Sequence, residues 1–204
     1  MQFDYTVILT LMILSTFVVI TLIKLVYRYN PHYSEHYGKE IVLFHRLERY
    51  KRRVWRFNLI EELKDQKTKK KVTDELELKV ICGEFSDGKR EIIKHAAYHK
   101  FESITIISGS KVFCENRMEI YTLLDQYKNV EYLILPRRPT NHFMIFNKSH
   151  LYIEKPHRHD KSRGSVGVKN TQLELIKIYD EAFNKMMEHA RHLYKEEVFQ
   201  QDCY

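Results

Sequence analysis

The fold is decided by residues 130–154, VEYLILPRRPTNHFMIFNKSHLYIE. The apolar run at 130–135 stops at PRRP, and two further apolar runs flank the short polar turn NKS at 147–149. Runs of about five residues rich in β-branched and aromatic side chains, separated by such a turn, are typical of a β-hairpin. We therefore predict a strand at 130–135 and a hairpin made of HFMIF (142–146) and HLYIE (150–154).

The residues upstream of this stretch alternate between strand and helix patterns. LELKVIC (76–82) and SITIIS (103–108) are predicted strands, and an apolar-periodic helix follows each of them. The first helix is capped by Ser86 or Asp87, and the second covers 116–128. Strands that alternate with helices predict an α/β sandwich around a mixed sheet.

Downstream of the hairpin we expect a polar loop over 155–170 and then a long helix. The capping box Thr171-x-x-Glu174 marks the start of that helix. Its predicted buried residues are Leu173, Ile176, Tyr179, Phe183, Met187 and Ala190. The predicted fold class is therefore α/β, with a compact ligand-binding domain over 73–204 that contains a mixed sheet, a β-hairpin and a long C-terminal helix.

The N-terminal residues 6–23, TVILTLMILSTFVVITLI, carry no charge, and residues 25–27 extend this apolar run past Lys24. A helix of this length crosses the hydrocarbon core of a bilayer, which is roughly 30 Å thick. A cleavable signal peptide would have a basic start and a small-residue cleavage site, whereas this chain begins MQFDY. We predict one transmembrane helix over 6–27, preceded by an extracytoplasmic tail over 1–5.

The formal charge of +7 is concentrated directly after this predicted span. Between Lys24 and Val72 there are fourteen Lys and Arg against six Asp and Glu, whereas from Thr73 onward there are twenty of each. By the positive-inside rule the C-terminus faces the cytoplasm, which predicts a single-pass protein of the inner cell membrane. The position of the basic residues favours anionic lipid headgroups as a partner, and no duplex nucleic acid is expected.

The predicted segment between span and domain, residues 28–72, is a basic amphipathic stalk and linker. Within 39–65, which lack Pro and Gly, five apolar residues follow a 4-3-4-3 spacing: Leu43, Leu47, Tyr50, Val54 and Phe57. This seam favours a helix that self-associates. Two alternatives stay open, namely a helix that lies on the headgroups and a helix docked on the following domain.

Three threonines of the predicted span, Thr6, Thr10 and Thr21, share one helix face with Lys24 and Arg28. Their hydroxyls can bond to their own backbone or pack against a second span. Alternatively, several copies of the chain turn this polar face inward and line a hydrated path.

Residues 136–169 contain eight Lys and Arg and four His against only Glu154 and Asp160. These basic residues flank the hairpin, so both groups are expected at one edge of the sheet, where ligands of α/β proteins bind. Arg and His donors suit a phosphate, although an ordinary solvated basic loop is the alternative. The predicted ligand-binding residues are Arg137, Arg138, His142, Asn147, His157, Arg158, Lys161 and Arg163, with Ser108, Gly109 and Ser110 in a loop whose amides suit an anion.

Metal binding is not predicted from the sequence. His157-x-His159-Asp160 has two imidazoles in one short segment, but no second cluster matches it. We therefore expect no metal and no cofactor.

Residues 130–157 resemble half of a phospholipase D-like fold, whose module has the form HxKxxxxD followed by GSxN. Aligned by the apolar strand, the module's His, Lys, Asp, Gly-Ser and Asn fall, in that order, on Thr140, His142, Asn147, Glu154-Lys155 and His157. The resemblance implies the fold, a phosphate pocket and pairing of half-modules across a two-fold axis. It does not imply the reaction, because Thr140 cannot replace the histidine nucleophile.

The layout of one span, a stalk and a cytosolic domain also resembles the membrane effectors of type III CRISPR systems, whose CARF-type domains bind cyclic oligoadenylate. The main hypothesis is accordingly a membrane-anchored oligomeric sensor and effector. Its domain would bind a nucleotide or cyclic oligonucleotide and alter membrane permeability in antiviral defence. Two alternatives are a membrane-anchored phosphodiesterase or nuclease, with His142, His157 and Glu154 as catalytic residues, and a non-catalytic membrane scaffold.

Overall fold

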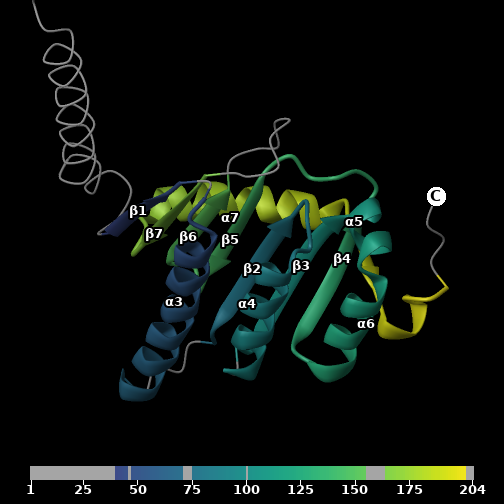
Figure 1. Cartoon of the computed structure of the whole chain (residues 1–204), viewed down its shortest axis with the longest axis horizontal. Helices are drawn as coiled ribbons and strands as arrows, with labels where there is room; N and C mark the ends of the chain where they lie inside the picture. The colour runs from purple at the N-terminus through teal and green to yellow at the C-terminus, as the bar shows by residue number, and fades with distance from the viewer. Residues whose placement is uncertain (1–39, 46, 71–74, 100, 155–163, 201–204) are drawn as a thin grey trace, which may run out of the picture. The chain divides into compact units, whose positions relative to one another are not determined.

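The computed structural model describes residues 40–45, 47–70, 75–99, 101–154 and 164–200 (Figure 1). The chain divides into two units, residues 1–36 and 37–204, and all described residues belong to the second. The predicted span over 6–27, with Thr6, Thr10 and Thr21, lies outside the described residues. Among the residues that are described, no helix is both long enough and apolar enough to cross a bilayer.

The described residues form one eight-stranded mixed sheet in the order β1-β7-β6-β5-β2-β3-β4-β8. The strands are β1 (Glu40–Phe44), β2 (Glu77–Cys82), β3 (Ser103–Gly109), β4 (Val130–Leu135), β5 (His142–Phe146), β6 (His150–Glu154), β7 (Ser165–Lys169) and β8 (Arg191–Leu193). β2, β3 and β4 pair in parallel, and the other neighbours pair antiparallel. The predicted α/β class and mixed sheet are confirmed.

Helices cover both faces of this sheet (Figure 1). They are α3 (Arg49–Lys70), α4 (Asp87–Tyr98), α5 (Ser110–Glu115), α6 (Arg117–Gln126) and α7 (Leu173–Glu188), followed by a short 3-10 helix, η1 (Lys195–Glu197). α3, α4 and α6 lie side by side on one face, and α7 lies on the other. Because β3 is covered on both faces, it is buried almost throughout, whereas β2 alternates at its start, with Glu77 and Lys79 only partly buried, and is buried from Val80 to Cys82.

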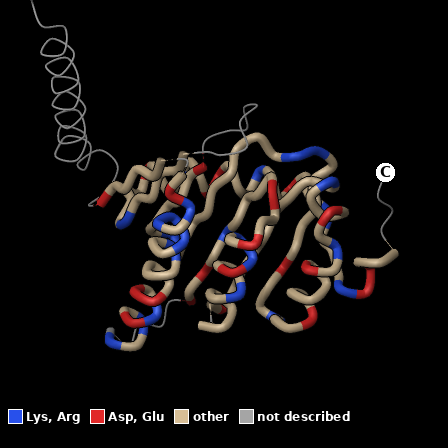
Figure 2. The backbone as a smooth tube through the Cα atoms, in the orientation of Figure 1, with Lys and Arg blue, Asp and Glu red and all other residues tan. Residues whose placement is uncertain are grey.

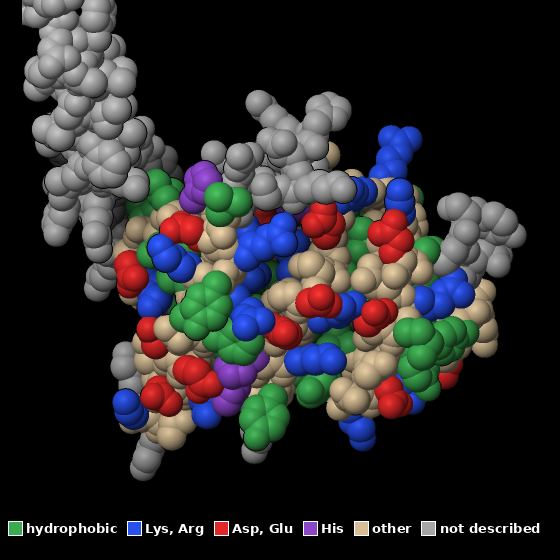
Figure 3. All heavy atoms as spheres, viewed as in Figure 1, with side chains coloured by type: hydrophobic (Ala, Val, Ile, Leu, Met, Phe, Trp, Pro, Cys, Tyr) green, Lys and Arg blue, Asp and Glu red, His purple; other side chains and the backbone are tan. Residues whose placement is uncertain are grey.

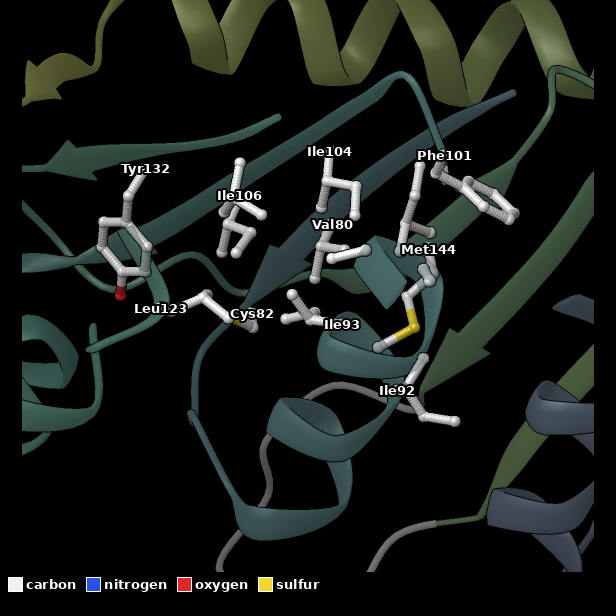
Figure 4. Packing of buried hydrophobic residues seen from close by; sticks show 14 of the residues in the cluster. Val80, Cys82, Ile92, Ile93, Phe101, Ile104, Ile106, Leu123, Tyr132 and Met144 are labelled. Atoms are coloured by element: carbon white, nitrogen blue, oxygen red, sulfur yellow. The ribbon is translucent and has the colours of Figure 1, made fainter. Parts of the chain in front are cut away.

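Two apolar clusters fill the spaces between the layers. On the α4 side, Val80 of β2 and Ile106 of β3 face Ile93 of the helix (Figure 4). On the α7 side, Phe183 packs with Phe143 of β5 in the second cluster. The sheet is thus packed against helices on both of its faces.

The predicted hairpin is confirmed as β5 and β6, which pair from His142↔Glu154 to Phe146↔His150. Its turn places Asn147 at φ 48° and Lys148 at φ 52°. Two consecutive residues with positive φ match the right-handed twist of the flanking strands, as in tight hairpin turns.

The segment after the hairpin differs from the prediction. The second half of the expected loop over 155–170 is strand β7, which its short sequence SVGVK did not reveal. The long C-terminal helix is confirmed as α7, but two of its predicted buried residues, Leu173 and Met187, are exposed. The predicted apolar face runs along the full length of the helix. In the structure the buried residues of α7 are Ile176 and Phe183, so burial is confined to its middle.

The expected helix over 39–65 is wrong in its first part, because residues 40–44 form edge strand β1 and the helix begins at Arg49. α3 is docked on the domain, which was one of the three alternatives. Its buried apolar residues are Trp55, Leu59, Ile60 and Leu63. These differ from the predicted seam, of which Leu43, Leu47 and Tyr50 are exposed. Self-association of the chain remains a prediction.

Trp55 fixes α3 against the sheet through a close contact with Gly167 of β7. A Cβ atom at Gly167 would lie 2.7 Å from Cζ2 of Trp55. The indole ring also packs between Phe44 and Tyr152, with ring centroids 6.1 and 6.2 Å away. The missing side chain of Gly167 is therefore what allows the helix to approach the strand.

We expect Gly167→Ala to lower the free energy of unfolding by about 1–3 kcal/mol, because the added methyl group overlaps the indole. Urea denaturation of the full chain in detergent measures this loss. Gly88→Ala is the matched control, since its Cβ would meet nothing within 4 Å. An equal effect of the two substitutions would contradict the proposed contact.

Candidate functional site

The carboxyl ends of the parallel strands β2, β3 and β4 lie at one edge of the sheet. β5 starts and β6 ends at the same edge, because Phe143 pairs with Ile81 and His142 pairs with Glu154. Asn147 lies at the opposite edge, where its backbone N–H donates to the backbone carbonyl of Glu77 at 2.8 Å. The structure therefore brings His142 to the predicted edge and separates Asn147 from it.

Two strand-terminal glycines allow other groups to pack against this edge. A Cβ at Gly83 would lie 2.1 Å from Nε2 of His142, and a Cβ at Gly109 would lie 2.7 Å from Cα of Arg138. Ser108 is fully buried and its hydroxyl bonds to that of Tyr132. The loop that contains Ser108, Gly109 and Ser110 thus supports the segment before β5, and the Ser110 hydroxyl donates to the carbonyl of Pro136 at 3.2 Å.

A buried charged cluster lies beside these glycines. Nζ of Lys89 is 2.9 Å from Oε2 of Glu154, and Nδ1 of His142 is 3.6 Å from the same oxygen. Burial alone would raise the pKa of Glu154, but the charge of Lys89 and the hydrogen bonds from His142 and Lys89 outweigh it. They hold the pKa of Glu154 far below its ordinary value of 4.5. Glu154 is consequently ionised at neutral pH and holds both basic side chains.

A pocket of about 530 Å³ opens next to this cluster, between the first turns of α3 and the start of α4. Five basic side chains line it: Arg49, Arg52, Arg53, Arg56 and Lys89. The four arginines follow an i, i+3, i+4, i+7 spacing, so they share one face of α3. Figure 2 shows basic residues along the first turns of this helix, and Figure 3 shows basic side chains gathered where these turns meet α4.

The three acidic side chains that line the pocket already have basic partners. Glu154 pairs with Lys89, Glu84 lies 3.2 Å from Arg138, and Asp87 pairs with Arg90. Their negative charge is therefore largely compensated. Arg53 is itself paired with Glu91 at 2.7 Å, so the positive potential inside the pocket comes chiefly from the other arginines of α3.

Arg56 forms the floor of this pocket. It is 6% exposed, and its guanidinium lies 4.6 Å from the centre of the Tyr152 ring. Burial lowers the pKa of Arg56, whereas nearby Tyr152 and Glu154 raise it. Because a guanidinium stays charged in proteins, Arg56 presents a fixed positive charge from below.

The predicted binding residues lie in different places. Arg137 and Arg138 are exposed at the pocket's edge of the sheet, and Arg138 reaches the pocket through Glu84. Four others lie outside the described residues: His157, Arg158, Lys161 and Arg163. Sequence reasoning missed Lys89 and the arginines of α3, although the helical spacing of RYKRRVWR (49–56) was a usable signal.

Comparison with protein-family models and with curated proteins finds no match for this chain. Solved structures do match its fold. Nuc from Salmonella typhimurium, a phospholipase D family member, superposes with a TM-score of 0.56 at 10% identity, over 76% of this chain and 98% of that one. NucT from Helicobacter pylori gives a TM-score of 0.54 at 13% identity, over 76% and 99%. The chain has a phospholipase D-like fold.

TrmBL2, an archaeal chromatin protein whose structure shows a novel mode of DNA binding, also matches. Its TM-score is 0.54 at 11% identity, over 93% of this chain and 66% of that one. At such low identity these likenesses concern the fold alone. Within the phospholipase D-like fold, Thr140 is exposed before β5, and His142 is buried as the first residue of that strand.

Proposed function

We propose that this chain uses a phospholipase D-like domain to bind a phosphate-bearing ligand in the pocket between α3 and α4, without the histidine nucleophile of that family. The observation that carries the proposal is the stripe of four arginines, 49, 52, 53 and 56, in a pocket whose acidic side chains are each paired with a base. Guanidinium groups bind phosphate oxygens through two parallel hydrogen bonds, which a carboxylate-lined pocket would not support.

The size of the pocket supports a small ligand. A volume of about 530 Å³ lies within the range of roughly 300–1,000 Å³ that is typical of small-molecule sites. A nucleotide or a short oligonucleotide end fits that size class, and the floor formed by Arg56 and Tyr152 offers a charge and an aromatic ring together.

A phosphodiesterase or nuclease is the second candidate, and the likeness to Nuc and NucT supports it. Its chemistry would need a nucleophile that reaches phosphorus. The His142 side chain is 0% exposed, and its Nε2 lies 3.1 Å from the carbonyl oxygen of Pro139. The position of His142 therefore favours a structural role, and we place binding before hydrolysis.

We further propose that the predicted span over 6–27 anchors this domain in a membrane. In this proposal, paired domains pass ligand binding to the membrane helices, as the layout of CARF-type antiviral effectors suggests. The basic residues between 24 and 72 that do not line the pocket would then face anionic lipid. This membrane role rests on the sequence pattern alone.

The binding test uses the full chain in detergent, with pyrophosphate, ATP and a short oligodeoxynucleotide as probes in calorimetric titrations. The double substitution Arg49→Ala and Arg52→Ala should weaken binding of the best probe at least tenfold. The reason is that each charge-assisted hydrogen bond contributes about 1.5–3 kcal/mol. Absence of binding by every probe would overturn the proposal.

The matched control removes two exposed lysines elsewhere, through Lys69→Ala and Lys111→Ala. It lowers the net charge equally and should change affinity less than twofold. Hydrolysis of a model phosphodiester is followed in parallel. Turnover that His142→Ala abolishes, in a variant that still unfolds cooperatively, would establish the second candidate instead.

A further inference from the structure

Three potential metal ligands converge on the face where α3 packs against α4, away from the arginine pocket. His95 and His99 are four residues apart on α4, so they share one face of that helix. Glu61 of α3 faces both of them, with its Oε1 2.9 Å from Nε2 of His95 and 2.8 Å from Nε2 of His99. All three ligand atoms lie within 4.8 Å of one another.

This arrangement is close to the geometry of a tetrahedral zinc site. Metal–ligand bonds of about 2.0–2.2 Å would place neighbouring ligand atoms roughly 3.4 Å apart. The observed separations of 2.8 and 2.9 Å from Oε1 would therefore need to open by only about half an ångström. Small rotations of the two imidazoles can supply that change.

One of the three ligand atoms, Nε2 of His95, is poorly satisfied within the described part of the chain. Nε2 of His95 is buried, and although it lies 2.9 Å from Oε1 of Glu61, that contact does not meet the geometry of a hydrogen bond. A buried polar atom without a partner is costly unless something binds it. Burial and the neighbouring His99 also lower the pKa of His95, which favours the neutral imidazole that metals bind.

The two carboxylate oxygens of Glu61 have different neighbours, and Oε1 is the one available to a cation. Lys64 lies 3.7 Å from Oε2 of Glu61, so its charge is directed to the oxygen that the histidines do not face. The ring of Phe57 packs 4.4 Å from that of His95 and closes the inner side. The Glu61 side chain is 44% exposed, which gives an ion access from solvent.

We propose that Glu61, His95 and His99 bind a divalent transition-metal ion of the zinc class. Two imidazoles and one carboxylate suit zinc, cobalt or nickel, whereas magnesium and calcium prefer sites made of oxygen alone. Three protein ligands leave a fourth position open to water or another ligand. A bound ion would cross-link α3 and α4, the two helices that also line the arginine pocket.

The test titrates zinc chloride into the full chain after chelator treatment and dialysis in detergent. We expect one ion per chain and, at a hundredfold excess over the dissociation constant, a rise of about 5–10 °C in the thermal unfolding midpoint. Magnesium should cause no rise. Cobalt chloride should give the visible absorption of a tetrahedral site.

Glu61→Gln and His99→Gln should each weaken zinc binding at least tenfold and remove the cobalt absorption. His189→Gln, on an exposed histidine, is the matched control and should leave both unchanged. A variant with His157→Gln and His159→Gln tests the HxH segment of the sequence. Zinc binding that survives Glu61→Gln and His99→Gln but disappears in this variant would overturn the proposal, as would no binding by the wild type.

Discussion

Replacing Lys89 with methionine should lower the free energy of unfolding by about 3–5 kcal/mol. Lys89 is 5% exposed and Glu154 lies 2.9 Å from it, so the substitution leaves a carboxylate buried without its main partner. His142 compensates only in part, since its Nδ1 is 3.6 Å from that carboxylate. Urea denaturation of the full chain in detergent at pH 7 measures the loss.

Two variants show whether the unpaired charge is the cause. Lys94→Met removes an exposed lysine from the same helix and should change stability by less than about 0.5 kcal/mol. Adding Glu154→Gln to Lys89→Met removes the unpaired anion and should restore most of the loss. If Lys89→Met costs no more than Lys94→Met, the buried pair does not support the fold.

The same pair predicts the response to acid. Because the pKa of Glu154 is lowered in the folded state, its contribution is fully present above the ordinary value of 4.5 and is lost as the pH falls below it. In the Lys89→Met variant the pKa of Glu154 should be higher, so stability should depend less on pH below 4.5.

Mild acid should destabilise the protein through a different residue, His150. Burial lowers the pKa of His150 from 6.5 to about 4, and the positive charge of Lys169 contributes to the same shift. The backbone amide of Asn170 donates to its Nδ1 at 2.8 Å, which requires an unprotonated ring nitrogen. Between pH 6.5 and 4 the unfolded chain therefore binds a proton that the folded chain does not. Stability should fall by about 3 kcal/mol as the pH drops through this range.

Free energies of unfolding measured at pH 7 and pH 4.5 give the slope of stability against pH. His150→Gln should remove most of this slope, because glutamine does not titrate and its side-chain oxygen can still accept a hydrogen bond from the backbone amide of Asn170. His189→Gln removes an exposed histidine and should keep the wild-type slope. The range lies above the one in which Glu154 titrates, so the two effects can be separated. Equal slopes for His150→Gln and wild type would contradict the assignment.

The strands of the domain could be predicted because their physical signals are local. β3 and the hairpin strands are short apolar runs bounded by turn residues, and β2 shows the alternation of a strand in its first residues. β1 was missed because EIVLF (40–44) also fits the start of a heptad seam. Its strand conformation depends on pairing with β7, which no local pattern reveals.

The candidate site was predicted only in part. The prediction that Arg138 and His142 lie at one edge of the sheet follows from the ends of the strands in the sequence. The prediction that Asn147 belongs to the same site is wrong, because Asn147 lies at the opposite edge. An extended strand rises about 3.3 Å per residue, so the five steps from His142 to Asn147 move roughly 16 Å to the opposite edge. From the sequence alone, the arginines at 49–56 indicate membrane-proximal charge, because their place in the pocket depends on the docking of α3, which is a tertiary contact.

The pairing of β1 with β7 has a consequence for synthesis of the chain. Glu40 pairs with Lys169, 129 residues further along, and Trp55 needs Gly167 for its packing. A ribosome adding about 5–20 residues per second needs on the order of 10 s to make that intervening stretch. Among the described strands, β1 is made first and must therefore wait for β7, so its pairing can form only after residue 169 has been synthesised. During that interval the edge strand EIVLF can pair with other strands, and the apolar face of α3 can bind other apolar surfaces, so both are sites where aggregation could begin.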